Sequence, residues 1–432
     1  MPGAASNALI ADATLKGYPK DARPTPLGDV GKLGWNILRE DVPMPVAVLR
    51  RSAIDNNSRW MRRFLELSGA WICPHGKTTM SPQLFHRQLA DGAWGITIAT
   101  VNQLRICRAH GIDRIVMANQ LVDRSAIRYV LDELDRNETF DFYCLVDSLA
   151  GVERLAGMAA AHGTRRPLQL LLEGGVRHGR TGCRERADAV AVAEAVKAAE
   201  PGLVLRGIEG YEGLITGATP AEKQANIDAF LDYLADLTET GLERDWFAPG
   251  PVILTAGGSS YYDIVTHRLG RLTAEREIRV VIRSGCYLTH DSRYYGTHFA
   301  ELLERSPTAR EVGGGLEPAL EVWAAIQSMP EPGLAIATMG KRDVSFDIDL
   351  PMPEQWCRPG PEARPQPLGS DHTVTALNDQ HAYLDVPADT PLEVGDIVGF
   401  GISHPCTAFD RWQLLYLVDD DYAVTGAVRT FF

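Results

Sequence analysis

The sequence predicts an α/β protein made of a (β/α)8 TIM-like barrel and a second, β-rich domain. The chain has 432 residues, whereas one barrel takes about 250 residues, so a second domain accounts for the remainder. Between residues 70 and 282, short apolar runs alternate with mostly amphipathic segments, as parallel strands alternate with covering helices. The eight runs are Ala70 to Cys73, Gly95 to Ala99, Arg114 to Met117, Phe142 to Val146, Leu168 to Leu172, Leu205 to Ile208, Val252 to Leu254 and Val280 to Ile282.

The boundaries follow from changes in composition along the chain. Residues 1–45 begin with an irregular stretch that contains alanine and proline, and residues 46–295 are assigned to the barrel domain. This domain opens with Val46 to Leu49, an apolar run that predicts a strand, and Ser52 can cap the helix that follows. In residues 296–432 proline and glycine become frequent, and three runs predict strands of the second domain. They are His381 to Val386, Ile397 to Phe400 and Leu414 to Val418.

Composition excludes several classes of function. Hydrophobic residues make up 45% of the chain and charged residues 23%, which is ordinary for a folded globular protein. The net charge of -13 disfavours nucleic acids and anionic membranes as partners, because no basic block offsets it. Seven cysteines without a CxxC pair suit a reducing compartment, and no apolar run approaches the ~18 residues of a membrane span. We therefore expect a cytoplasmic protein.

A single lysine follows the first predicted barrel strand, within Pro74 to Thr79. Barrel enzymes place their chemistry at the carboxyl ends of the strands, so Lys77 would lie on the rim of the active site. In partly desolvated surroundings a lysine is more often neutral, and a neutral amine can form a Schiff base with an aldehyde. Without the rest of the chain, a solvated surface lysine would be the better interpretation.

Glycine-rich segments follow the seventh and eighth predicted strands, where barrels commonly bind a phosphate. Glycine lets the backbone approach a phosphate closely, and free N–H groups in a turn stabilise its charge. An ordinary turn is the alternative, but the position in the barrel favours a phosphate site. The predicted phosphate and cofactor contacts here are Gly257, Gly258, Ser259, Gly285, Cys286 and Tyr287.

A second motif, His404-Pro405-Cys406, lies near the end of the chain. On an extended segment, residues two apart point to the same side, so His404 and Cys406 could bind one metal ion. A nitrogen and a sulfur ligand favour zinc, and two protein ligands leave positions open for water and substrate. The alternative is a cysteine that is simply a small buried hydrophobe.

The segment Pro74 to Pro82 resembles the pyridoxal-phosphate lysine segment of the D-serine dehydratase and D-threonine aldolase family, and the similarity extends from about Val46 to the C-terminus. The resemblance implies a fold-type III enzyme, built like alanine racemase from a barrel and a β domain, with part of residues 1–45 joining the β domain. It implies pyridoxal phosphate on Lys77, with His75 as a further cofactor contact. It also implies a homodimer in which the second domain of one subunit completes the site of the other.

The resemblance assigns roles to two further rim residues. Arg180 would lie near the phenolic oxygen of the cofactor and hold it as an anion, because an arginine keeps its proton. Tyr211 would lie near the cofactor ring. Considered without the family, Arg180 could equally form a salt bridge across the rim, and Tyr211 could be a packed aromatic residue. His381 occupies a place where the family often has Glu-His-Gly, but Gln and Ala flank it here, so its role is open.

D-Serine dehydratases carry His-x-Cys where D-threonine aldolases carry His-x-Asp, so the resemblance of His404 and Cys406 favours the dehydratase side. The predicted function is a zinc- and pyridoxal-phosphate-dependent lyase that converts a D-3-hydroxy amino acid to a 2-oxo acid and ammonia. Lys77 would remove the α-proton. D-Serine, D-threonine and D-3-hydroxyaspartate all fit as substrates. The alternatives are retro-aldol cleavage to glycine and an aldehyde, an amino-acid racemase, and a pyridoxal-phosphate-binding protein without turnover.

Overall fold

The computed structural model describes residues 8–272 and 276–432. Eight parallel strands form a curled sheet in the order β4-β11-β10-β9-β8-β7-β6-β5. The two end strands meet through a parallel bridge between His75 and Thr97, and Thr97 N–H donates to the carbonyl of Pro74 at 2.9 Å. The strands are β4 (Trp71–Ile72), β5 (Ile96–Ile98), β6 (Arg114–Gln120), β7 (Asp141–Val146), β8 (Leu168–Gly174), β9 (Leu203–Gly210), β10 (Val252–Ala256) and β11 (Ile278–Ile282). The predicted barrel is confirmed.

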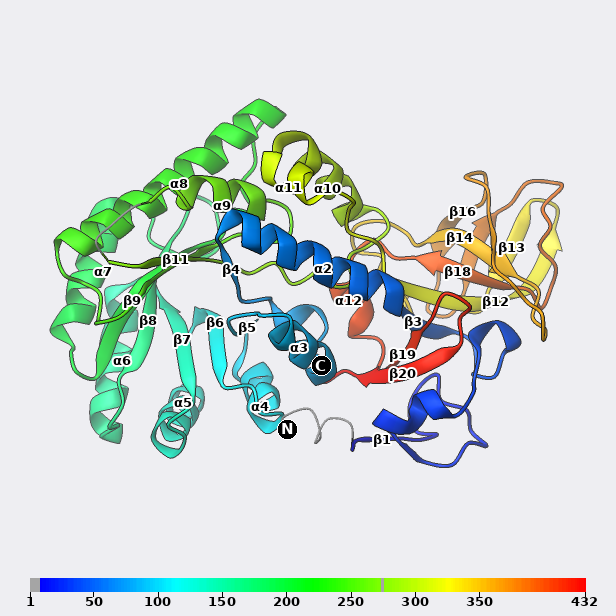
Figure 1. Ribbon diagram of the computed structural model, residues 1–432, viewed down its shortest axis with the longest axis horizontal. Coiled ribbons are helices and arrows are strands. Elements are labelled where there is room, and N and C mark those ends of the chain that lie inside the picture. The colour runs from blue at the N-terminus through cyan, green and yellow to red at the C-terminus, as the bar shows by residue number, and fades with distance from the viewer. Residues whose placement is uncertain (1–7, 273–275) are drawn as a thin grey trace.

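Helices cover the outside of this sheet (Figure 1). Strands enclosed in this way are buried on both faces, which is why they are continuous apolar runs rather than alternating ones. All five residues of β10 are buried, for example. The barrel-domain helices are α2 (Arg51–Ser68), α3 (Pro82–Ala90), α4 (Val101–Ala109), α5 (Arg124–Arg136), α6 (Leu149–His162), α7 (Arg186–Ala198), α8 (Pro220–Glu243), α9 (Tyr262–Leu269), α10 (Tyr294–Arg305) and α11 (Pro307–Val312).

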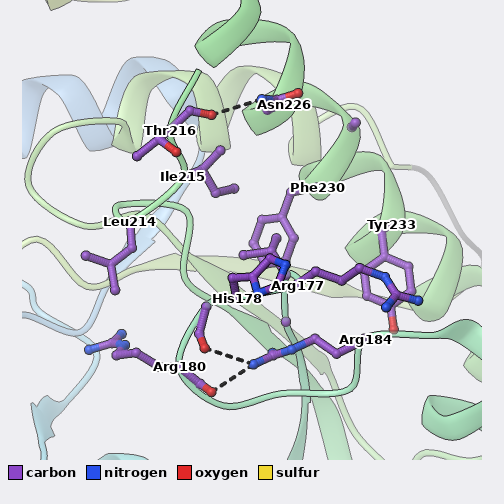
Figure 2. Close-up of a pocket in the computed structure, with 14 residues that line it drawn as sticks. Arg177, His178, Arg180, Arg184, Leu214, Ile215, Thr216, Asn226, Phe230 and Tyr233 are labelled. Atoms are coloured by element: carbon purple, nitrogen blue, oxygen red, sulfur yellow. Dashed lines mark hydrogen bonds between the residues drawn. The ribbon is translucent and has the colours of Figure 1, made fainter. Parts of the chain in front are cut away.

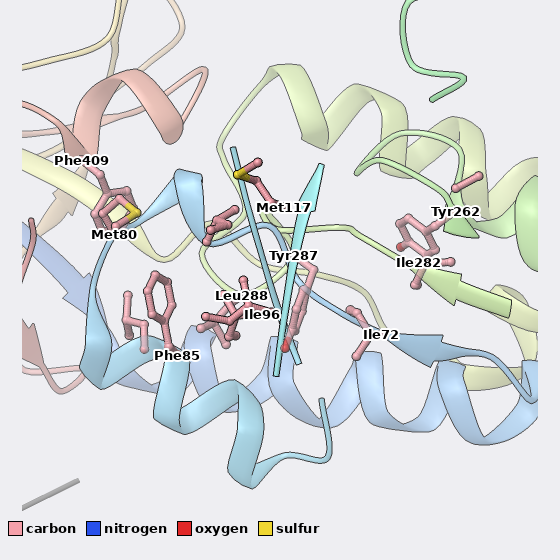
Figure 3. Close-up of a cluster of buried hydrophobic side chains, with 14 of the residues drawn as sticks. Ile72, Met80, Phe85, Ile96, Met117, Tyr262, Ile282, Tyr287, Leu288 and Phe409 are labelled. Carbon is pink, nitrogen blue, oxygen red and sulfur yellow. The ribbon is translucent and has the colours of Figure 1, made fainter. Parts of the chain in front are cut away.

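Figure 3 shows part of the apolar core of the barrel domain, including Phe85 and Ile96. Phe85 of α3 and Ile96 of β5 are fully buried there, and both lie under Gly76, where a β-carbon would come within 2.8 Å of the Phe85 ring. Tyr287 belongs to the same cluster and is only 4% exposed. This packing fixes the backbone on either side of Lys77.

The second domain is a mostly antiparallel sheet on the other side of α2 (Figure 1). Strand β3 (Val46–Arg50) belongs to this sheet and not to the barrel, because it pairs antiparallel with β12 and parallel with β19. The predicted domain boundary at residue 46 therefore differs from the structure, in which the barrel strands begin at β4. The remaining strands are β12 (Leu320–Glu331), β13 (Leu334–Ala337), β14 (Met352–Cys357), β15 (Gln366–Pro367), β16 (Thr373–Leu377), β17 (Ala382–Asp385), β18 (Ile397–Gly401), β19 (Leu414–Val418) and β20 (Val424–Arg429).

The N-terminal segment packs on this sheet. It contains β1 (Ile10–Ala11), β2 (Thr25–Pro26) and the short 3-10 helices η1 (Leu27–Lys32) and η2 (Ile37–Arg39). Leu27, Val30 and Ile37 are buried in one apolar cluster with Tyr416 of β19. Among the described residues, none of the helices combines the length and the apolar character that crossing a bilayer requires.

The loop after β11 contains a buried histidine that should make stability depend on pH. His290 is 3% exposed, and burial lowers the pKa of its imidazole from 6.5 to about 4. The unfolded chain takes up a proton below about pH 6.5 and the folded chain does not, so stability is present above that pH and is lost as the pH falls toward 4. Relative to a His290→Asn variant, the wild type should lose about 2 kcal/mol of unfolding free energy between pH 7 and pH 5.

Urea unfolding of the wild type and of His290→Asn at pH 7 and pH 5 measures this change in unfolding free energy. Asparagine suits the positive φ of +47° at this position. Burial raises the pKa of the neighbouring Asp291 to about 7, an opposite effect that both proteins share and that the comparison removes. An equal loss in both proteins would show that His290 does not control this dependence.

Candidate active site

A cavity of about 410 Å³ opens at the carboxyl ends of the barrel strands, where the second domain meets the barrel. Its size suits a small-molecule or cofactor site. Residues from both domains line it. The predicted site residues on its wall are His75, Lys77, Arg180, Tyr211, Gly258, Ser259, Gly285, Cys286, His404 and Cys406.

Three predicted or suspected residues do not line this cavity. Tyr287 points into the barrel core. Gly257 lies behind the wall, and its N–H donates to the carboxylate of Glu212 at 2.9 Å. His381 is exposed in the turn between β16 and β17. Tyr287 follows a residue that does line the cavity, and neighbouring residues in a loop commonly face opposite ways, so its proximity in sequence was misleading.

Lys77 lies on the 3-10 helix η3 (Gly76–Thr78), which follows β4. Its side chain is exposed to the cavity, and its ammonium group forms no hydrogen bond or ion pair with the described residues. The expectation of a desolvated lysine is therefore not met by the protein alone. Among the described residues the amine has no partner, and a ligand in the cavity can reach it.

His75 lies two residues before Lys77 and is held neutral. Burial, followed by the charges of Lys77 and Arg283, keeps the pKa of its imidazole well below the ordinary value. Its Nδ1 atom is buried and has no hydrogen-bond partner in the described part of the chain. A buried polar atom without a partner on a cavity wall is suited to meet a polar ligand.

An ion pair that sequence reasoning missed lies within the barrel. Arg283 donates from Nη2 to Oε1 of Glu209 at 2.6 Å, and the two residues are 6% and 2% exposed. Nη1 of Arg283 also donates to the hydroxyl of Thr255 at 2.8 Å. Oε2 of Glu209 is buried and has no partner among the described residues. Burial raises the pKa of Glu209, and the positive charge of Arg283 opposes this shift.

The glycine-rich segments after β10 and β11 differ in how their backbone N–H groups are used. The N–H groups of Gly257 and Gly258 both donate to Glu212, at 2.9 and 2.8 Å, so this carboxylate occupies two of the predicted phosphate donors. Cys286 N–H donates to the hydroxyl of Ser259 at 3.3 Å, across the cavity wall. At Gly285 a β-carbon would lie 2.4 Å from the carbonyl oxygen of His75. Only glycine fits there. Of the predicted phosphate contacts, Ser259 and Gly285 line the cavity, whereas the N–H of Cys286 is already bonded to Ser259.

Arg180 stacks on Tyr211, with its guanidinium carbon 4.6 Å from the ring centroid. Arg180 forms no salt bridge in the described part of the chain, so the interpretation as a structural ion pair is not supported. Burial raises the pKa of Tyr211 to about 12, with Glu212 adding to the shift and Arg180 opposing it. The phenol is therefore neutral near pH 7.

Arg180 also borders a second, more open cavity of about 640 Å³ (Figure 2). Phe230 and Tyr233 of α8 form part of its wall. Arg184 is held in place there, because it donates to the carbonyls of Gly179 and Arg180 at 3.1 and 2.8 Å. Arg180 thus lies between the two cavities, on a loop that Arg184 fixes.

The His-x-Cys motif differs from its predicted geometry. The segment is not extended: Pro405 has φ -61° and ψ -35°, and Cys406 begins the short helix α12 (Cys406–Phe409). Proline has the dihedral angle of a first helical residue, which the spacing argument did not consider. His404 and Cys406 nevertheless both face the cavity.

The imidazole of His404 is oriented by a carboxylate. Its Nδ1 lies 2.6 Å from Oδ2 of Asp347, and the hydroxyl of Thr407 donates to Oδ1 at 2.6 Å. Burial alone would raise the pKa of Asp347, but the hydrogen bonds from Thr407 and His404 outweigh it and lower the pKa. The ionised carboxylate favours a proton on Nδ1 and leaves Nε2 as the nitrogen that can bind a metal.

Sequence signals existed for some of the missed residues. Glu173, Glu209 and Arg283 are charged residues at or directly after the ends of apolar strands, and all three line the cavity. A charge at the carboxyl end of a barrel strand indicates a functional position. Tyr295, the second residue of α10, also lines the cavity but had no such signal.

Known proteins match both parts of the chain. Residues 49–250 match the model of the alanine racemase N-terminal domain, and residues 319–418 match that of the putative serine dehydratase domain. The chain is 25% identical over 313 residues to the 3-hydroxy-D-aspartate aldolase of Paracoccus denitrificans (strain Pd 1222), which covers 72% of this chain and 75% of that protein.

Two solved structures share the fold along most of the chain. The D-threonine aldolase from Filomicrobium marinum superposes with a TM-score of 0.75 at 20% identity, covering 92% of this chain and 97% of that one. The D-threo-3-hydroxyaspartate dehydratase from Delftia sp. HT23 superposes with a TM-score of 0.66 at 19% identity, covering 92% and 99%. The chain therefore combines a barrel domain that matches the alanine racemase N-terminal domain family with a β-rich domain that matches the putative serine dehydratase domain family.

Proposed function

We propose that the protein is a pyridoxal-phosphate- and metal-dependent lyase for D-3-hydroxy amino acids, of the D-serine dehydratase type. The observation that carries this proposal is the shared cavity: the amine of Lys77 comes from the barrel, and the imidazole and thiol of His404 and Cys406 come from the second domain. A racemase or a pyridoxal-phosphate carrier would have no use for the second pair. The homodimer stays a prediction.

The cavity fits pyridoxal phosphate in three respects. Lys77 offers an amine that has no partner in the described part of the chain. Ser259 and Gly285, which follow the seventh and eighth barrel strands, line the cavity at the place where barrels commonly bind a phosphate. His75 Nδ1 and Glu209 Oε2 are buried polar atoms that lack partners among the described residues. When bound, pyridoxal phosphate supplies an aldehyde for amines and a ring that accepts electrons from the substrate's α-carbon.

The metal fit rests on two side chains. His404 presents Nε2, because Nδ1 is bonded to Asp347, and Cys406 presents a thiol. In residues 8–272 and 276–432, no group of three or more histidine, cysteine or acidic side chains is arranged to hold an ion. Two ligands leave room for a substrate hydroxyl. A divalent ion such as zinc, when bound there, supplies a Lewis acid for the oxygen at Cβ.

The residues of the cavity then have separate roles in the reaction. Lys77 Nζ takes the proton from Cα of the substrate. His404 and Cys406 would hold the metal ion that faces the β-hydroxyl, the leaving group. When the Cβ–O bond breaks the hydroxyl departs as water, and hydrolysis of the resulting enamine gives the 2-oxo acid and ammonia. His75, held neutral beside Lys77, keeps a second positive charge away from the amine. Arg180 keeps a permanent positive charge on the wall next to Tyr211.

Retro-aldol cleavage is the second candidate, because similar proteins include a 3-hydroxy-D-aspartate aldolase and a D-threonine aldolase as well as a dehydratase. The thiol of Cys406, in place of the carboxylate found in the aldolases, favours elimination. The deciding experiment is to incubate the purified protein, loaded with pyridoxal phosphate, with D-serine, D-threonine and D-3-hydroxyaspartate, with and without a chelator.

Both 2-oxo acid and glycine are assayed. A chelator-sensitive 2-oxo acid without glycine is the expected result. Glycine together with an aldehyde would replace the dehydratase proposal with the aldolase. Neither product from any of the three substrates would overturn the lyase proposal.

Asp347→Ala is expected to weaken metal binding about 10- to 100-fold, as other changes in the carboxylates behind metal-binding histidines do. The physical reason is that Asp347 fixes the ring of His404 and the position of its proton. Competition with a chromophoric chelator measures the affinity. Asp349→Ala is the matched control, because Asp349 accepts a hydrogen bond from Ser403 at 2.8 Å and none from His404. Equal losses in both variants would assign the effect to the loop rather than to the imidazole.

A further inference from the structure

Two cysteines from different domains are in contact on the wall of the cavity. Cys286 follows β11 of the barrel, and Cys406 begins α12 of the second domain. Their sulfur atoms are 3.7 Å apart, and the hydroxyl of Thr78 lies 3.6 Å from the first and 3.5 Å from the second. No other two thiols are in contact in the described part of the chain, which includes all seven cysteines.

The two sulfurs differ in access. Cys286 is 4% exposed, whereas Cys406 is only half-buried, and both line the cavity. A small oxidant that enters the cavity therefore meets Cys406 first, with a second thiol within van der Waals contact. This arrangement of a reachable thiol beside a buried partner is typical of a thiol pair that closes on oxidation.

We propose that Cys286 and Cys406 form a reversible disulfide when the protein meets a peroxide. Hydrogen peroxide oxidises the Cys406 thiol to a sulfenic acid and leaves as water. The Cys286 sulfur then attacks the Cys406 sulfur, the S–O bond breaks, and a second water departs. In total the two thiols lose two electrons and two protons, and the peroxide is reduced to two waters. A dithiol reductant reverses the reaction by exchange.

The disulfide would have two consequences. It would join the barrel to the second domain across the cavity, beside Thr78 and one residue from Lys77. It would also remove the thiolate that Cys406 offers to a metal, so oxidation would switch the site off. The second consequence rests on the proposed function, whereas formation of the disulfide does not.

The experiment maps the thiols after oxidation. Reduced protein is treated with hydrogen peroxide, denatured, alkylated and digested. We expect five of the seven cysteines to be alkylated, a peptide containing Cys286 joined to one containing Cys406, and full reversal by a dithiol. Arg358 and Arg364 each precede proline, so the tryptic peptide of Cys406 extends over residues 343–411 and also contains Cys357. A second cleavage at acidic residues separates these two cysteines.

Two variants test which cysteines form the disulfide. Cys357→Ser should still form the link, because Cys357 lies elsewhere in the second domain, whereas Cys286→Ser should not. If Cys286→Ser fails to fold, the map of the wild type still decides. Oxidised wild type in which Cys286 remains fully alkylatable, or in which Cys406 is joined to Cys357, would overturn the proposal.

Oxidation in the presence of zinc separates the disulfide proposal from the proposed function. Zinc added before the peroxide should slow the link several-fold if Cys406 binds the metal. A link that forms equally fast with zinc would sustain the thiol pair and overturn the metal assignment. A protein that turns over D-3-hydroxy amino acids but never forms the link would sustain the proposed function and overturn the disulfide.

Discussion

Replacement of Lys77 by alanine should lower turnover by at least about 10⁴-fold, because one amine serves both as the attachment point and as the base. The variant should also retain no pyridoxyl group after borohydride reduction, whereas the wild type should gain one group on the peptide that contains Lys77. Lys77 is the one lysine among the described residues that line the cavity, so its removal leaves no other primary amine there. Intact-mass measurement and the 2-oxo acid assay check the two parts separately.

Lys197→Ala provides the matched control. Lys197 lies on α7, outside the cavity, where its amine is 3.5 Å from a carboxylate oxygen of Glu200. This variant should keep both the pyridoxyl label and the activity. A label that persists in the Lys77 variant would mean that another amine holds the cofactor. The assignment of Lys77 as the attachment point would then be wrong.

The barrel could be predicted because each of its strands is buried on both faces. A run such as Leu168 to Leu172 is apolar throughout and too short for a helix, and the structure has a strand at each of the eight predicted runs. The same reasoning explains the error at Val46 to Leu49. A strand buried in the second domain has the same composition as a barrel strand, so hydrophobicity alone does not show which sheet it joins.

The outline of the site could be predicted because barrel enzymes place their chemistry at the carboxyl ends of the strands. Lys77, Arg180 and Ser259 all follow strands and line the cavity. The details depended on side-chain directions that no local pattern records. The sequence predicts Gly257 and Gly258 as phosphate donors, but Glu212, a neighbour of the predicted Tyr211, accepts both N–H groups. That contact joins the exits of two different strands, so only the folded chain reveals it.

Tertiary contacts also decide the chemistry of the metal pair. The sequence places a histidine and a cysteine two residues apart, and it does not show that Asp347 orients the imidazole from 57 residues away. Nor does it show that Cys286 lies against Cys406 from 120 residues away. These partners come from loops of both domains, and they define the site as much as the motif does.

His404→Ala is expected to release the metal and to lower turnover about 10³-fold, since a Lewis acid at the leaving hydroxyl supplies several kcal/mol. Metal content after dialysis should fall to the background level, and the pyridoxyl label on Lys77 should remain, because the two groups come from different domains. His381→Ala is the control, since His381 is exposed and does not line the cavity, and it should keep metal and activity. If His404→Ala kept its metal, or if His381→Ala lost it, the ion would have to lie elsewhere on the second domain.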